Sequence, residues 1–193
     1  MLYIDQRQYS HIPYYHNTAN GGPVEGRDNV GTSGCGLCCA CMTVEHLTTK
    51  TLDIEEAVKM AVDNEANRGA GVNMRILGPL VAEKFGLTHR LSESKEEAIA
   101  QLRAGGRVIA LVTKKPDGTP GLFTKRQHFI LLVSTDGEQV CILDPYVYPG
   151  KFQEEGRAGK VREDAPFLYC TWDALMEEVT PTGRFHLFGR KQP

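Results

Sequence analysis

The sequence is most constrained where a glycine-rich loop runs directly into an apolar helix. Residues 33–36 read Ser-Gly-Cys-Gly and precede the apolar run 37–47. A helix with no polar face has to be buried, so this run predicts a central core helix. Its first residue, Cys35, would lie beside unpaired backbone N–H groups at the positive end of the helix dipole, which lowers the pKa of a thiol and predicts a nucleophile. The later cysteines are expected to be core residues: Cys38, Cys39 and Cys41.

The composition predicts one globular domain over residues 1–193. With 41% hydrophobic residues, the chain is large enough to bury a core. Its 24 acidic and 22 basic side chains give a net charge of -2, which disfavours nucleic acid and membrane surfaces as partners. These features do not predict an oligomeric state.

The cysteines and the N-terminal segment bear on the cellular compartment. Four of the six cysteines lie within residues 35–41, where helical neighbours cannot easily bridge, so we expect reduced thiols. The N-terminal segment lacks a basic stretch followed by an apolar run, and no apolar run in the chain reaches membrane-spanning length. We therefore expect a cytoplasmic location, although a secreted mature form without its leader would share these features.

Helical periodicity precedes strand periodicity along the chain, which predicts an α+β fold with an antiparallel sheet. Residues 17–34 lack periodicity and read as a long loop. Ser94 and Glu97 have the spacing of a capping box. Beyond the central helix, helices are expected over about 53–65, 73–85, 94–104 and 172–179, and strands over 108–112, 128–133, 140–143, 167–171 and 184–188.

Two of the expected strands place a histidine near a carboxylate. Residues 135–137, Thr-Asp-Gly, have the form of a three-residue hairpin loop. If Ser134 pairs with Glu138, His128 lies directly opposite Asp144 on the same face of the sheet. An imidazole oriented by a carboxylate is the base of a nucleophilic triad. The alternative is that Asp144 only terminates a strand and that His128 caps a strand end in solvent.

These motifs together resemble a known family. Gly-Cys-Gly at 34–36 before a helix, the strand 128–133 and Ile-Leu-Asp-Pro at 142–145 are similar to the papain-like cysteine peptidases of the double-glycine leader, or bacteriocin-processing, group. The resemblance is strongest to the stand-alone bacterial domains related to that group. It implies a central helix with Cys35 packed on an antiparallel sheet with His128 and Asp144. It also implies attack of a thiolate on a peptide or another amide, through an acyl-enzyme that water resolves.

The resemblance also implies an amide side chain that helps the backbone N–H of Cys35 to hold the developing oxyanion. Gln6 best matches the N-terminal Gln-x-x-Tyr segment of the stand-alone domains, with Gln8 and Asn17 as the other candidates. The expected activity is thus a cysteine peptidase or amide hydrolase that uses no metal or other cofactor. The alternatives are an acyltransferase or transglutaminase-like enzyme with the same triad, and a catalytically silent peptide-binding module.

Other candidate residues have simpler interpretations. Cys35-x-x-Cys38 with His46 could suggest zinc or a redox pair, but no second Cys-x-x-Cys or His-x-x-x-His follows. His46 and His186 lie in apolar surroundings and are expected to be satisfied core or edge residues, and Trp172 a core anchor. The charged run 151–164 reads as a solvated loop whose position beside the site also permits a lid. His11 and His16 are expected at the surface.

Overall fold

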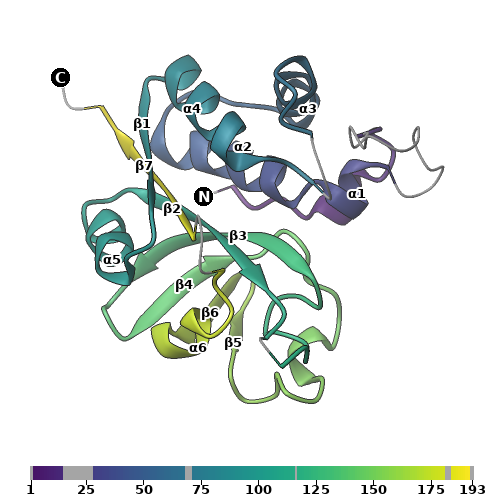
Figure 1. Cartoon of the computed structure of the whole chain (residues 1–193), viewed down its shortest axis with the longest axis vertical. Helices are drawn as coiled ribbons and strands as arrows, with labels where there is room; N and C mark the ends of the chain where they lie inside the picture. Colours follow the sequence, from purple (N-terminus) through teal and green to yellow (C-terminus); the bar gives the residue numbers. More distant parts are fainter. Residues whose placement is uncertain (1, 15–27, 68–70, 116, 181–183, 192–193) are drawn as a thin grey trace.

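A seven-stranded antiparallel sheet forms the middle of the molecule (Figure 1). The computed structural model describes residues 2–14, 28–67, 71–115, 117–180 and 184–191. The strand order is β1-β7-β2-β3-β4-β6-β5. The strands are β1 (Leu87–Ser92), β2 (Arg107–Thr113), β3 (Gln127–Thr135), β4 (Gln139–Leu143), β5 (Arg162–Asp164), β6 (Phe167–Thr171) and β7 (Phe185–Arg190).

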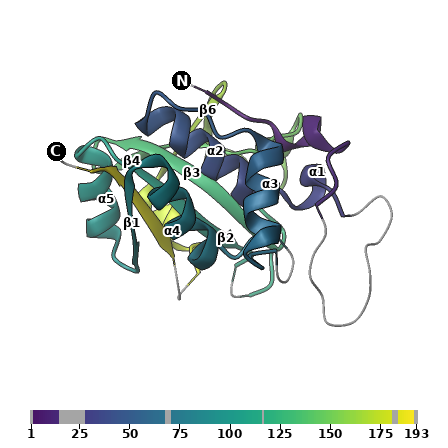
Figure 2. The ribbon, with the colours of Figure 1, turned by 90° about the horizontal axis from the view of Figure 1, so that it is seen from above.

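Helices cover both faces of this sheet and create two apolar cores. The first core joins one face to α2, α3 and α4, and the second joins the other face to α5 and α6 (Figures 1 and 2). The helices are α1 (Val30–Ser33), α2 (Cys35–Leu47), α3 (Ile54–Asp63), α4 (Met74–Phe85), α5 (Lys95–Arg103) and α6 (Trp172–Met176), with 3-10 turns η1 (Gln6–Tyr9) and η2 (Lys151–Gln153). This mixed helix and antiparallel sheet layout confirms the predicted α+β fold class.

Polar caps set several helix boundaries close to their predicted positions. The side chain of Asp53 accepts from the backbone N–H of Glu56, and Gly86 ends α4 in the left-handed conformation with φ 71°. The Ser94 side chain caps α5 by accepting from the N–H of Glu97. The Glu97 carboxylate pairs with Arg90 on β1, and the N–H of Ser94 donates to Ser92, so the capping box is half formed.

Several elements differ from the sequence-based expectation. Residues 30–33, expected in a loop, form a helical turn because the Asn29 side chain accepts from the N–H of Thr32. Most of the rest of that expected loop lies outside the described residues. Strand β1 was not predicted, since its burial alternates irregularly and its stability comes from pairing with β7. The exposed strand β5 lies inside the charged run that reads as a loop, and α6 ends at Met176 rather than near residue 179.

The β3–β4 hairpin is where the predicted register is wrong. Thr135 pairs with Val140 around a four-residue turn, and a bulge at residue 133 then shifts the register so that Leu131 faces Leu143. Extending this pairing by one residue sets Asp144 opposite residue 130, two positions from His128. A displacement of two residues keeps both side chains on the same face of a sheet, in diagonal contact.

The bulge is what keeps His128 and Asp144 on one face. Continued without it, the pairing at the turn would set Asp144 opposite Leu131, whose side chain packs in the core beneath α2. The neighbouring positions Ile130 and Leu132 belong to the core on the opposite face. One inserted residue therefore decides whether the carboxylate can reach the imidazole.

Within the described part of the chain, no helix is both long and apolar enough to cross a membrane.

Candidate active site

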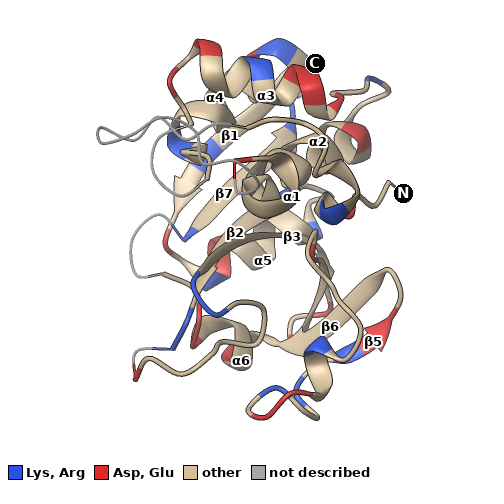
Figure 3. Ribbon diagram, turned by 90° about the vertical axis from the view of Figure 1, so that its right-hand side faces the viewer, with Lys and Arg blue, Asp and Glu red and all other residues tan. Residues whose placement is uncertain are grey.

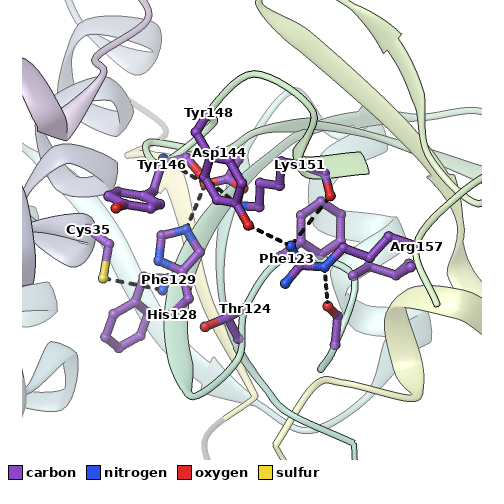
Figure 4. Close-up of polar contacts among 12 residues, drawn as sticks. Cys35, Phe123, Thr124, His128, Phe129, Asp144, Tyr146, Tyr148, Lys151 and Arg157 are labelled. Carbon is purple, nitrogen blue, oxygen red and sulfur yellow. Dashed lines mark hydrogen bonds and ion pairs between the residues drawn. The ribbon is translucent and has the colours of Figure 1, made fainter. Parts of the chain in front are cut away.

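Cys35 lies at the first position of α2, and glycines bring this helix start close to β3. A Cβ on Gly36 would come within 2.3 Å of Val72 and 3.0 Å of Phe129, so only glycine allows this approach. The backbone N–H of Phe129 donates to Sγ of Cys35 over 3.5 Å (Figure 4). Burial alone would raise the pKa of Cys35, but the His128 imidazole and the backbone N–H groups of Phe129 and Gly36 lower it below that of a free cysteine.

The other cysteines of α2 lie in a different environment. Cys38, Cys39 and Cys41 are fully buried in the core, as expected. Burial raises the pKa of each of these thiols, because a thiolate loses its hydration there. The reactive form is therefore favoured at the start of the helix and disfavoured along its body.

His128 and Asp144 are in direct contact. Nε2 of His128 lies 2.6 Å from Oδ1 of Asp144, and both side chains are almost completely buried. This bond occupies Nε2 and leaves Nδ1 as the nitrogen for Cys35. Although burial would lower it, the pKa of His128 rises to about 9 because the Asp144 carboxylate and the Cys35 thiolate favour the imidazolium.

Lys151 completes the surroundings of Asp144. Its Nζ donates to Oδ2 of Asp144 over 2.6 Å and to the backbone oxygen of Tyr146 over 2.7 Å (Figure 4). The ammonium also lies within 6.0 Å of the ring centroids of Tyr148 and Phe152. Burial lowers the pKa of Lys151, while His128 and Lys151 together hold the pKa of the buried Asp144 below its usual range.

The burial of Lys151 corrects the interpretation of residues 151–164 as a solvated loop or lid. Lys151 is 2% exposed and Arg157 is 1% exposed. Arg157 donates from Nε to the backbone oxygen of Gly121 over 2.8 Å and forms an ion pair with Glu154. The start of this charged run is therefore part of the site's support. The run itself offers no sequence signal for this burial, because the main partners of Lys151 and Arg157 lie outside it: the Asp144 carboxylate and the carbonyl of Gly121.

The N-terminal arm places Gln6 in the lining of the same cavity as Cys35. Its backbone N–H donates to the carbonyl of Pro145, and the Tyr3 hydroxyl donates to the backbone oxygen of Asp144. Nε2 of Gln6 donates to the carbonyl of Gly31 over 2.9 Å, which fixes the orientation of the amide and leaves its second N–H for another acceptor. Gln8 is exposed, and Asn17 lies outside the described residues.

A cavity of about 460 Å³ lies at the site. It is lined by Cys35, Gln6, His128, Tyr146 and Tyr148, among other residues. A second, smaller hollow of about 100 Å³ is also lined by Cys35, together with Val72 and Leu111. The thiol therefore borders two hollows of different size.

The remaining histidines and Trp172 have structural contacts. His46 bonds to the backbone oxygen of Leu2, and His186 bonds to His89 over 3.1 Å, as satisfied residues should. Trp172 is buried and donates to the Thr135 hydroxyl. His11 is exposed, and His16 lies outside the described residues. In the described ranges, no group of three His, Cys, Asp or Glu side chains could hold a metal ion.

Comparison with known proteins places this architecture in a fold class. No family model and no curated protein matches the chain. Among solved structures, a protein from Bacillus anthracis assigned as a C39-like peptidase matches with a TM-score of 0.57 and 17% identity, covering 95% of this chain and 97% of that one. The peptidase domain of Streptococcus ComA, a bifunctional ABC transporter of a quorum-sensing pathway, matches with a TM-score of 0.53 and 14% identity, covering 88% of this chain and 96% of that domain.

These matches define the fold of the chain. Both neighbours are C39-type peptidase structures, and each match covers most of both chains. The chain therefore has the papain-like fold of C39 peptidases, as the sequence motifs predicted.

Proposed function

We propose that the protein is a cysteine peptidase or amide hydrolase in which Cys35, His128 and Asp144 act as a triad. The observation that carries this proposal is the 2.6 Å contact between His128 and Asp144, beside a thiol whose pKa is lowered at a helix start. The C39-like fold supports the same class of reaction.

In the proposed mechanism, the Cys35 thiolate attacks the carbonyl carbon of a peptide-like amide. The second N–H of Gln6 and the backbone N–H of Cys35 stabilise the negative oxygen of the tetrahedral intermediate. The His128 imidazolium gives its proton to the leaving amine, which releases the amine and leaves an acyl-enzyme. His128 then takes a proton from water as the water attacks, and the acid product and the free thiolate are restored. No step of this route uses a metal.

The oxyanion contact provides a direct test. Gln6→Ala should lower turnover of a fluorogenic peptide by about 100-fold or more, the scale of one lost oxyanion donor, and leave iodoacetamide alkylation of Cys35 nearly unchanged. Gln8→Ala is the matched control, because this exposed glutamine lies two residues away. A peptide mixture analysed by mass spectrometry for new termini, with Cys35→Ala as the blank, would identify the substrate for this assay. Equal turnover by Gln6→Ala and wild type would contradict the assigned role.

A further inference from the structure

The cavity beside Cys35 has an unusual balance of charge. Four of its lining residues are lysines or arginines, and none of the described residues that line it is an aspartate or glutamate. The four cations are Lys125, Arg126, Lys151 and Arg157. Asp144 and Glu154 contact this set from outside the lining. A surplus of positive charge therefore faces the space where a substrate would lie.

Two of these cations are committed to contacts within the protein. Lys151 neutralises Asp144, and Arg157 pairs with Glu154 while it donates to the carbonyl of Gly121. Because Lys151 compensates the triad carboxylate, an approaching anion does not meet an unbalanced negative charge there.

The other two cations are exposed on the segment that leads into β3. Lys125 lies 3.5 Å from Glu154 in a solvent-exposed pair, which has a small stabilising effect. The guanidinium of Arg126 has no hydrogen-bond or ion-pair partner among the described residues, and its backbone N–H and oxygen are anchored by Thr124 and Thr113. In Figure 3 the connection between β2 and β3, which carries these two residues as well as Lys114 and Lys115, includes blue segments.

The segment that carries Lys125 and Arg126, the cationic wall of the cavity, is held in place by a buried carboxylate, Glu178. Glu178 accepts from the backbone N–H groups of Leu122 and Phe123, and Arg157 donates to the carbonyl of Gly121. A Cβ on Gly121 would come within 2.6 Å of the Glu178 carboxylate, so a glycine is required there. The chain that presents Thr124, Lys125 and Arg126 is thus fixed before a substrate arrives.

We propose that the cavity selects substrates that carry a carboxylate close to the amide that Cys35 attacks. The carboxylate is an aspartate or glutamate side chain or a peptide C-terminus, and Arg126, with Lys125, is its binding partner. The planar guanidinium can donate two parallel hydrogen bonds to such a group. The inference rests on the proposed function, since it assigns the substrate class of the same site.

The first test uses two alkylating agents that differ in charge. Iodoacetate carries a carboxylate and iodoacetamide does not, so the alkylation rate of Cys35 by iodoacetate divided by its rate with iodoacetamide measures the preference for an anion. In Arg126→Glu at low salt this ratio should fall about threefold or more, because an attractive charge becomes repulsive. Lys59→Glu, an equal charge change on an exposed residue of α3, is the control and should leave the ratio nearly unchanged. An unchanged ratio in Arg126→Glu would overturn the inference.

The second test is independent of thiol reactivity. Binding to Cys35→Ala is measured by calorimetry for acetyl-Ala-Ala-Glu-Ala-Ala-amide, its Gln counterpart, and the Gln peptide with a free C-terminal carboxylate. We expect one carboxylate peptide to bind at least fivefold more tightly than the neutral peptide, which also identifies the source of the carboxylate. Equal binding by all three, or no binding by any, would overturn the inference. Slow iodoacetamide alkylation of Cys35 would count against the proposed function instead.

Discussion

Two buried carboxylates support the site, and their surroundings differ. Asp144 is fully buried and contacts the His128 imidazole and the Lys151 ammonium. Glu178 is 1% exposed and accepts from two backbone N–H groups. The pKa of Asp144 is lowered by its cationic partners despite burial, whereas burial raises the pKa of Glu178 against the effect of its N–H donors.

The difference shows that burial alone does not decide the charge of a carboxylate. A carboxylate with two cationic partners stays ionised and can stabilise an imidazolium, which the proposed reaction needs. A carboxylate held by backbone dipoles can shape a loop without a fixed charge. The first carboxylate is therefore assigned to the chemistry and the second to the cavity wall.

The largest expected effect is from removing the cation beside Asp144. Lys151→Met should lower the free energy of unfolding by about 3–5 kcal/mol, because it leaves a buried carboxylate oxygen without its counter-charge. Urea denaturation near pH 7 measures this change. Lys151→Met combined with Asp144→Asn is the matched control and should recover much of the loss, since no unpaired charge remains. If Lys151→Met were as stable as wild type, the Asp144–Lys151 ion pair would not stabilise the fold.

The next effect concerns the reactivity of Cys35. Asp144→Asn should slow alkylation of Cys35 by iodoacetamide at pH 7 about tenfold or more. The variant removes the negative charge that stabilises the His128 imidazolium and leaves the positive charge of Lys151 nearby. Glu178→Gln should leave this rate within about twofold of wild type. Mass mapping after brief alkylation measures both. Equal slowing by the two variants would remove the distinction between the carboxylates.

The smallest effect is a difference in how stability depends on pH. Asp144 has a lowered folded pKa, so its contribution is present above its unfolded value of about 3.9 and is lost as the pH falls through the folded pKa. Glu178 has a raised folded pKa, so its contribution is present below about 4.3 and is lost as the pH rises through the folded pKa.

These signs predict opposite trends for the two variants. Relative to wild type, Asp144→Asn should be most destabilised at neutral pH, with the gap closing below about pH 4. Glu178→Gln should gain stability relative to wild type as the pH rises above the unfolded value of about 4.3, because the buried carboxylate resists ionisation. Urea denaturation at several pH values measures both trends, and parallel trends would contradict the assigned pKa directions.

The sequence predicts the helix side of the site more securely than the sheet side. The glycines around Cys35 and the apolar run behind it are local signals, and α2 begins where they indicate. The contact between His128 and Asp144 was inferred from a register that is two residues wrong. The contact forms because a bulge puts the Asp144 side chain on the same face of the sheet as His128, and no local residue pattern predicts this bulge.

Contacts formed only in the folded chain explain what the sequence could not predict. Lys151 opens a run of charged residues that is typical of a solvated loop, yet it is buried against Asp144 and the neighbouring rings of Tyr148 and Phe152, an arrangement that depends on how the chain turns after β4. Similarly, β1 is a strand because β7, which is about 100 residues further along the chain, pairs with it. Such partners are fixed by tertiary contacts rather than by local propensity.

The most direct test of the account is a titration of the Cys35 thiolate, measured as absorbance at 240 nm and corrected with Cys35→Ala. In wild type the midpoint should lie below that of a free cysteine, since His128 stabilises the thiolate. In His128→Ala burial is left without this compensation, so the midpoint should rise above the free value and alkylation at pH 7 should nearly stop. The same midpoint in both proteins would contradict the proposed thiolate–imidazolium pair.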